Sequence, residues 1–203
     1  ALGEAANDAL LKLGGDAVIR EWALRAVTDR KTQLSKVSPD PFVAALKDKN
    51  PRVQVAAEVA LGRIGKSAVA PALLALANPP AGLVEPTDSK QDGPHATPNS
   101  PVVVPHIAVR TLVSLNAGEA SVAAIGGPDT NGALWALRYI HDEKVVDGLI
   151  KKYAEIKDSA LQNKLLSVLI RQYQQETPYD GSYWWSTRPD TRGPVFKLSL
   201  IHI

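Results

Sequence analysis

Apolar residues recur at helical spacing through most of the chain. In four segments a small residue is followed four positions later by a larger aliphatic one. The small residues are Ala23, Ala57, Ala108 and Ala133, and the aliphatic residues are Val27, Leu61, Leu112 and Leu137. Positions four apart share one helix face, and small residues on that face let a neighbouring helix approach closely. The pattern predicts four equivalent helices, at residues 21–30, 56–65, 107–116 and 132–141.

Shorter apolar-periodic segments alternate with these four and are predicted to be the second helix of each pair. They cover residues 41–47, 68–77 and 145–156; a further helix ends at Leu13, and a last long helix runs from Asp158 or Ser159 to about Gln175. Because one helix pair cannot bury its own apolar face, stacked pairs with a continuous core are expected. The predicted fold class is therefore all-α, as an α-solenoid over residues 1–176. An irregular helical bundle is the alternative.

Residues 79–105 interrupt this pattern with a Pro-rich insertion. The segment holds seven of the chain's fifteen prolines and has no helical period. Proline at this density favours extended, loop-like backbone. Long loops of this kind are either functional or simply mobile. The sequence is compatible with two interpretations of this segment, an ordered strap across one face of the stack and a mobile polar loop.

A second non-repeat segment, residues 177–197, combines aromatic rings with charges. Tyrosines, phenylalanine and half of the chain's tryptophans lie beside two arginines and two aspartates. So much aromatic surface would not stay in water, so the segment is expected to dock on something. It either caps the end of the helical stack or forms a site or the entry to another domain. The candidate docking residues are Trp184, Trp185, Arg188, Asp190 and Arg192.

The segment KDKNPRVQVAAEVALGRIGKSAVAPALLALA, residues 47–77, resembles the HEAT family in its short, phycobilisome-lyase-type form. The resemblance implies that Asp48 and Arg52 belong to an Asp/Arg ladder between units. The strings HATP…VVPHIAVRTLVSL and YDGSYWWSTRPDTRGP further resemble HEAT regions of large planctomycete-type proteins. Those proteins carry a membrane-bound-dehydrogenase-like propeller and a cytochrome c-type haem domain. The resemblance implies an extracytoplasmic (periplasmic or similar) location and an electron-transfer setting for a parent protein, with a cytoplasmic location still open.

Composition narrows the chemistry. There is no Cys, which excludes a disulfide framework, a Cys-ligated zinc or iron–sulfur site, a thiol nucleophile and c-type haem attachment in these 203 residues. The basic and acidic residues nearly cancel, to a net charge of +2, which is too low for a protein that works mainly by binding nucleic-acid phosphates. No apolar run is long enough to span a membrane.

Residues 198–203, LSLIHI, match the translation of a transposase mosaic-end sequencing adapter and are predicted to be an artefact tail, with a short edge strand as the alternative.

The side chains offer little catalytic chemistry. The four histidines are His95, His106, His141 and His202. His95 and His106 flank the insertion near two aspartates, but no pair has the spacing of helix-borne metal ligands, so no metal site or cofactor is predicted. No nucleophile elbow and no phosphate-binding loop is present. Six arginines on the predicted helices are expected either to bond between repeats or to line an anion-binding concave face: Arg20, Arg25, Arg52, Arg63, Arg110 and Arg138.

The sequence therefore favours a non-catalytic scaffold that holds a protein or a neighbouring domain of the same parent chain, without a nucleic-acid partner. Two alternatives remain. A bilin-lyase-type enzyme uses similar repeats and would need convergent polar groups for a chromophore. A HEAT-like DNA glycosylase or other nucleic-acid binder would need a strongly basic face with aromatic residues on helices.

Overall fold

The computed structural model describes residues 6–30, 32, 34–80 and 101–176, together with three short strands at 184–185, 188–189 and 196–198. These residues form ten α-helices, and the predicted all-α class is confirmed apart from two small strand pairs. The helices are α1 (Asn7–Leu13), α2 (Arg20–Thr28), α3 (Asp40–Ala45), α4 (Pro51–Ile64), α5 (Ala70–Leu74), α6 (Val103–Ser114), α7 (Gly118–Ala123), α8 (Thr130–Leu137), α9 (Glu143–Glu155) and α10 (Ser159–Gln172); a 3-10 turn, η3 (Ser67–Val69), precedes α5.

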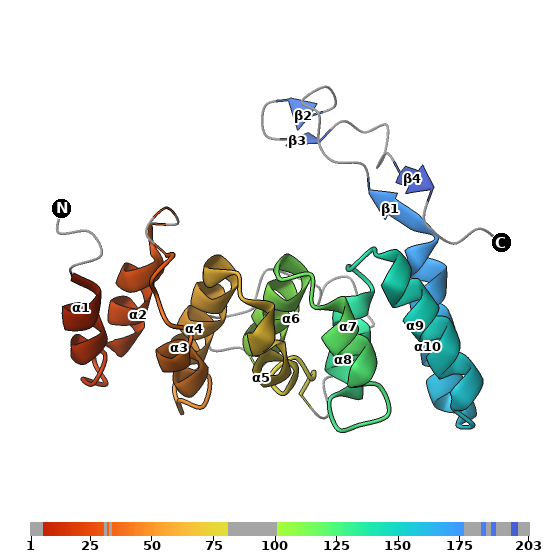
Figure 1. The fold of residues 1–203 in the computed structure, drawn as a ribbon, viewed down its shortest axis with the longest axis horizontal. Helices are drawn as coiled ribbons and strands as arrows, with labels where there is room; N and C mark the ends of the chain where they lie inside the picture. The colour runs from red at the N-terminus through yellow and green to blue at the C-terminus, as the bar shows by residue number, and fades with distance from the viewer. Residues whose placement is uncertain are drawn as a thin grey trace, which may run out of the picture.

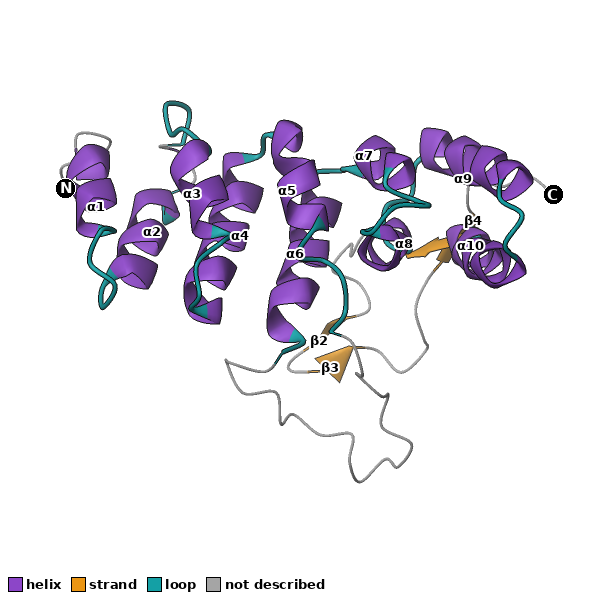
Figure 2. Cartoon of the chain, turned by 90° about the horizontal axis from the view of Figure 1, so that it is seen from below, coloured by secondary structure: helices purple, strands orange, loops and turns teal. Residues whose placement is uncertain are grey.

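The helices stand side by side in an elongated row that follows the chain from its N-terminal to its C-terminal end (Figure 1). They form two layers (Figure 2). One layer contains α2, α4, α6, α8 and α10, each packed against the next, and we call it the even layer. The other contains α1, α3, α5, α7 and α9, and we call it the odd layer. Each odd helix packs on the even helix that follows it in sequence, so the row consists of five helix pairs.

The repeated small–aliphatic pattern marks the contact face of the even layer. Ala57, Ala108 and Ala133 have no exposed surface, and Ala23 is also buried. The four aliphatic partners, Val27, Leu61, Leu112 and Leu137, are buried as well. The prediction that these positions form equivalent buried helix faces is confirmed.

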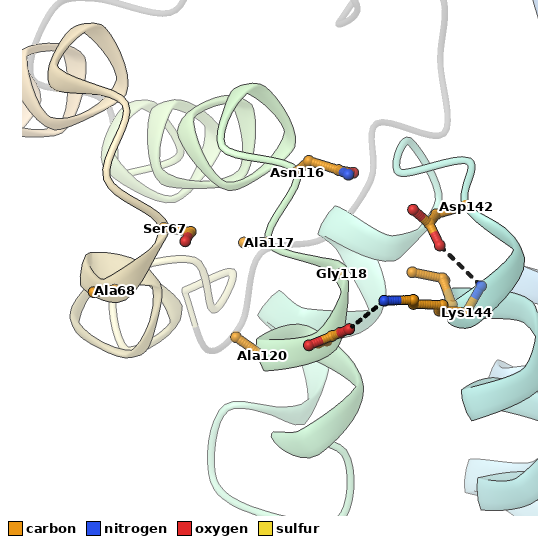
Figure 3. A pocket seen from close by; sticks show the side chains of 10 residues that line it. Ser67, Ala68, Asn116, Ala117, Gly118, Ala120, Asp142 and Lys144 are labelled. Atoms are coloured by element: carbon orange, nitrogen blue, oxygen red, sulfur yellow. Dashed lines mark hydrogen bonds and ion pairs between the residues drawn. The ribbon is translucent and has the colours of Figure 1, made fainter.

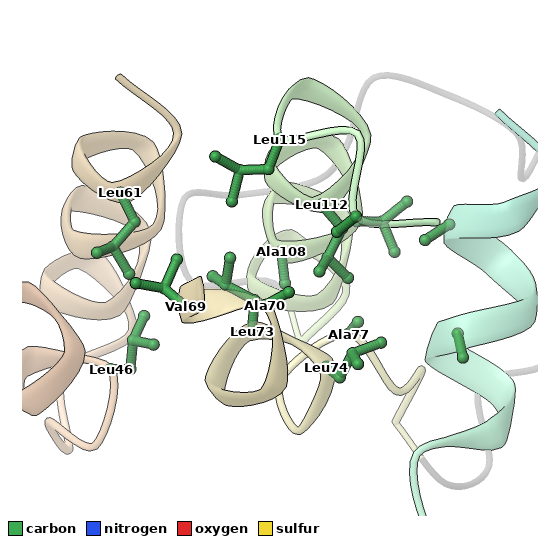
Figure 4. Packing of buried hydrophobic residues seen from close by; sticks show 14 of the residues in the cluster. Leu46, Leu61, Val69, Ala70, Leu73, Leu74, Ala77, Ala108, Leu112 and Leu115 are labelled. Atoms are coloured by element: carbon green, nitrogen blue, oxygen red, sulfur yellow. The ribbon is translucent and has the colours of Figure 1, made fainter. Parts of the chain in front are cut away.

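Buried aliphatic side chains run continuously through the row. Figure 4 shows leucines of α4 and α6 meeting the side chains of η3 and α5 between them. Phe42, Leu61, Leu73, Leu112 and Leu137 are among the largest fully buried side chains. Each buried Leu or Phe contributes about 1.5–3 kcal/mol relative to an exposed one. The core therefore belongs to the whole row rather than to any single pair.

The ends of α4 follow directly from its sequence. Asn50 caps the helix, since its side-chain oxygen accepts a hydrogen bond from the backbone N–H of Arg52 at 3.0 Å, and Pro51 occupies the first helical position. Gly65 ends the helix with φ of +78°, a conformation that costs glycine little. Local sequence signals thus specify both ends of α4, which begins five residues before the segment 56–65 that the repeated pattern predicts.

The predicted pairing of helices is wrong by one step. The sequence suggested that each short helix follows its partner, whereas in the structure α3 packs on α4, α5 on α6 and α9 on α10. Helix α7 was not predicted at all, because its six residues, GEASVA, are too short and too small for a recognisable period. The insertion also ends earlier than residue 105, since α6 begins at Val103; residues 81–100 lie outside the described part.

The C-terminal region contains two antiparallel strand pairs. β1 (Gln174–Glu176) follows α10, which ends earlier than predicted, and pairs with β4 (Phe196–Leu198). β2 (Trp184–Trp185) pairs with β3 (Arg188–Pro189). Within the non-repeat segment, Trp184 and Trp185 therefore lie on a short strand. Leu198, the first residue of the predicted artefact tail, lies opposite Gln174, and residues 199–203 are outside the described part.

Candidate functional site

The five predicted docking residues are only partly placed by the structure. Trp184, Trp185 and Arg188 lie on the small β2–β3 pair, with Trp185 opposite Arg188 in the register. Their backbones are described, and their side chains are not. Asp190 and Arg192 lie outside the described residues. The docking role of this segment stays a prediction.

The predicted histidines divide in the same way. The ring of His106 in α6 lies 6.1 Å from the ring of Trp135 in α8, with the planes tilted by 53°. His95 and His202 lie outside the described residues, and His141 follows α8. Among the residues that the structure describes, no group of three metal-ligating side chains converges, and no helix is long and apolar enough to cross a membrane.

Several of the singled-out arginines link neighbouring helix pairs. Arg20 at the start of α2 forms an ion pair with Asp48, which precedes α4, and its Nε donates to the carbonyl of Gly14 at 2.7 Å. A hydrogen bond from the backbone N–H of Asn50, together with Arg20, lowers the pKa of Asp48. Arg63 of α4 donates to the carbonyl of Thr28 at the end of α2.

Glu21 is the centre of a second link between α2 and α4. Its buried carboxylate accepts hydrogen bonds from Nε and Nη2 of Arg52 at 2.7 and 3.2 Å, and it also pairs with Arg25 at 2.8 Å. The guanidinium of Arg25 in turn lies 5.3 Å from the ring centre of Trp22. Arg52 and Asp48 therefore each bond to a residue of the preceding helix pair and not to one another.

Two arginines differ from the others. Arg110 in α6 and Arg138 at the end of α8 are both exposed, and neither side chain has a partner within the described part of the chain. Arg110 lies one helical turn beyond His106, whose ring meets Trp135, and Arg138 lies one turn beyond Trp135. Arg138 lines the same groove as the half-buried indole, and Arg110 lies on α6, one turn from the histidine that contacts it.

A groove of about 750 Å³ opens beside that indole, between α8 and α10. Its deepest residues are Leu134 and Val168, both buried. Trp135 and Pro79 add apolar surface, and the polar lining residues are Asn131, Arg138 and Lys164. The groove has an apolar floor and a cationic edge, with no acidic residue among those that line it.

Hydrogen bonds hold the groove in shape. Asn78, beside Pro79, donates to Asp129 at 3.0 Å and accepts from the backbone N–H of Gly132 at 2.9 Å, which fixes the segment after α5 to the start of α8. Lys164 of α10 donates to the side chain of Asn131 at 3.1 Å. The acidic residue of this network, Asp129, accepts the hydrogen bond from Asn78 and is not among the residues that line the groove.

A second surface lies at the end of the row, on the α9–α10 pair. In α10, Lys164, Val168 and Gln172 face α8, since they share the groove or bond to its residues. Residues two positions away lie on the opposite side of a helix. Leu166 and Ile170 therefore point away from the row, and both are exposed, Ile170 by 67 %.

Helix α9 continues this apolar surface. Gly148 faces Val122 of α7, so Ile150, two positions later, points away from the row and is 52 % exposed. Tyr153 and Tyr173 are exposed nearby on the same two helices. We call this set the end face: Ile150, Tyr153, Leu166, Ile170 and Tyr173.

A smaller hollow of about 380 Å³ lies on the odd layer, where the turns before η3, α7 and α9 meet (Figure 3). Its charged side chains are already engaged. Lys144 donates to Glu119 at 3.3 Å, and Asp142 caps α9 by accepting from the backbone N–H of Lys144 at 2.8 Å. The hollow thus offers a ligand no unengaged charge among the described residues.

Sequence reasoning missed Glu58, the most unusual titratable group in the described residues. It lies in α4 with no exposed surface, and neither carboxyl oxygen has a hydrogen-bond partner there. Its backbone carbonyl accepts from the hydroxyl of Thr111 in α6 at 3.1 Å. Burial raises the pKa of Glu58 to about 9, so the side chain is neutral at pH 7. Its place beside alanines in a small-residue helix was the available clue.

The chain matches no protein-family model, and a search of curated proteins finds no match. The function is therefore argued from the residues and surfaces described above.

Proposed function

We propose that the chain is a non-catalytic interaction scaffold, an α-solenoid of HEAT-like helix pairs that holds a partner protein or a neighbouring domain. Five helix pairs stacked in one row present long continuous surfaces, which suits binding to another protein. The resemblance of residues 47–77 to HEAT repeats supports the same reading. The inter-pair bonds made by Asp48 and Arg52 agree with it.

The observation that carries the proposal is the end face. Internal pairs bury the side that faces the next pair, whereas the α9–α10 pair exposes five large apolar side chains on that side. Exposed apolar clusters of this kind mark interaction sites in soluble proteins. We assign the end face to contact with a further folded unit of the parent protein or with a partner.

The wider setting is proposed from resemblance. The similarity of residues 16–197 to HEAT regions of large planctomycete-type proteins suggests an extracytoplasmic parent with a haem or dehydrogenase domain. On this proposal the region positions redox domains and carries no haem of its own.

Photo-crosslinking tests the scaffold proposal. We would place benzoylphenylalanine at Ile170 in the longest natural protein that contains this region, recovered by reading the gene beyond Lys197 and before Ala1. A matched probe at Lys151, an exposed residue of α9 outside the end face, serves as the control. Crosslinks from position 170, and few from position 151, to another domain or protein are expected. Equal or absent crosslinking at both positions would contradict the proposal.

The enzyme alternative is tested separately. A bilin-lyase-type protein binds free bilin with a shift in the visible absorption spectrum. Titration of the chain with bilin is expected to leave that spectrum unchanged. A saturable shift would replace the scaffold proposal with the enzyme reading.

A further inference from the structure

Charge is sorted between the two layers of the row. The five even-layer helices contain only two acidic residues, Glu21 and Glu58, and both are buried. Exposed basic residues on the same layer include Arg25, Arg110 and Lys164. The odd layer holds the other six helical carboxylates, three of them on α9. The overall charge of +2 therefore conceals a cationic face.

We propose that the groove between α8 and α10 binds an acidic linear segment of a partner protein, with an apolar side chain seated between Leu134, Val168 and Trp135. This inference rests on the scaffold function proposed above and specifies the chemistry of the partner at a second surface. Carboxylates of the segment pair with Arg138 and Lys164 at the groove edge. Arg110 adds a further cation on the neighbouring helix α6.

Charge complementarity identifies the occupant. Arg138 has no partner in the described residues, and Lys164 has only the neutral side chain of Asn131. Among the residues that the structure describes, no carboxylate lines the groove. Guanidinium and ammonium groups that lack a carboxylate partner gain charge-assisted hydrogen bonds when a carboxylate binds next to them. Because these cations lie at an edge exposed to water, they contribute mainly to specificity and association rate.

The apolar floor supplies the remaining selectivity. Leu134 and Val168 lie at the bottom of the groove, and the indole of Trp135 forms one side, held by the ring of His106. A buried Leu- or Phe-sized side chain is the kind of anchor that dominates binding energy at protein interfaces. A purely acidic segment without such a residue is expected to bind weakly.

The same features favour a protein segment over a nucleic acid. A phosphate backbone needs a continuous run of available cations. Along the even layer, Arg20, Arg52 and Arg63 are already bonded to neighbouring groups of this chain. At the α6–α10 end, Arg110, Arg138 and Lys164 have no carboxylate partner among the described residues, and Arg138 and Lys164 lie at the edge of an apolar floor.

The test uses fluorescence anisotropy with three labelled probes. The first is a peptide in which glutamates alternate with one leucine and one phenylalanine. In the second, glutamine replaces every glutamate, and the third is a short oligothymidylate. We expect saturable binding of the acidic peptide below about 1 mM, weakened by added salt, and much weaker binding of the other two.

Variants locate the binding site. The double variant Arg138→Glu/Lys164→Glu is expected to weaken acidic-peptide binding about tenfold or more. Lys151→Glu makes the same kind of charge reversal on an exposed position of the odd layer and should change affinity less than about twofold. Thermal unfolding verifies that all variants fold, and Arg138→Gln/Lys164→Gln provides a milder change at the same positions.

Each outcome decides the assignment. Unchanged affinity in the groove variants, no binding of the acidic peptide, or equal binding of the glutamine peptide would overturn it. Tighter binding of oligothymidylate would overturn it in favour of a nucleic acid. None of these results affects crosslinking from Ile170 on the end face, so failure of the groove assignment is distinguishable from failure of the scaffold proposal.

Discussion

At the scale of single residues, Glu58 shows most directly how burial changes the ionisation of a side chain. A carboxylate without partners in a helical core would be strongly unfavourable, so the group holds its proton instead. The protonated acid still lacks hydrogen-bond partners among the described residues, and this costs stability.

The pKa of Glu58 predicts a pH dependence of stability. The folded state keeps this proton up to about pH 9, whereas the unfolded chain loses it near 4.5, the ordinary pKa of a glutamate. The unfolded state then binds fewer protons between these values, so the free energy of unfolding falls as pH rises, by up to about 1.4 kcal/mol per pH unit. Urea denaturation of the wild type and of Glu58→Gln, at several pH values between 5 and 9, measures how the free energy of unfolding changes with pH.

We expect Glu58→Gln to remove most of this slope, because glutamine does not titrate. Glu143→Gln, at an exposed position in the first turn of α9, is the matched control and should retain it. Equal slopes in wild type and Glu58→Gln would show that Glu58 is ionised in the folded protein.

At the scale of elements, the sequence specifies helices well where local chemistry is strong. Helix α4 has a capping asparagine, a proline in its first turn and a left-handed glycine at its end, and its bounds were predictable. Helix α7 lacks a side-chain cap and was missed. The order of packing within pairs was also missed, because periodicity shows which face is buried but not which neighbour covers it.

Close helix crossings predict opposite effects for two glycine substitutions. A Cβ at Gly132 of α8 would come within 2.7 Å of the backbone carbonyl carbon of Ala77, so Gly132→Ala must displace backbone and should destabilise by about 1–3 kcal/mol. At Gly62 of α4 the nearest atoms are side-chain ends of Ser114 and Thr111 at 3.2 and 3.3 Å. These can move, so Gly62→Ala should be neutral or stabilising by up to about 1 kcal/mol.

Chemical denaturation of both variants measures this difference at constant pH. The two substitutions add the same methyl group to helices of the same layer, so any difference reflects the neighbouring atoms. Equal destabilisation would mean that the approach of α8 to Ala77 is looser than the structure shows.

At the scale of the whole molecule, two surfaces follow from the stacking of pairs. The cationic face arises because basic residues of separate helices share one layer, while the carboxylates of α9 lie on the other. The end face arises because the α9–α10 pair has no described neighbour on one side. Both surfaces combine residues that are far apart in the sequence.

The end face predicts binding of a neutral polarity-sensitive dye to the isolated chain. Leu166→Gln/Ile170→Gln should lower the dye fluorescence, because it removes exposed apolar area. The same change should alter stability by no more than about 0.5 kcal/mol, since both side chains are exposed. Val18→Gln, another exposed apolar position, is the control. An equal loss of fluorescence in Val18→Gln would show that dye binding does not report on the end face.

The sequence alone determined the helical class, the buried alanine and aliphatic positions of α2, α4, α6 and α8, and the ends of α4. These features depend on interactions within a few residues, so local periodicity and capping chemistry record them. Only the tertiary structure decided which helices share a layer, and therefore that Arg138 and Lys164 edge one groove and that Glu58 is unpaired. Those properties depend on packing between distant residues, which a net charge or a helix period does not encode.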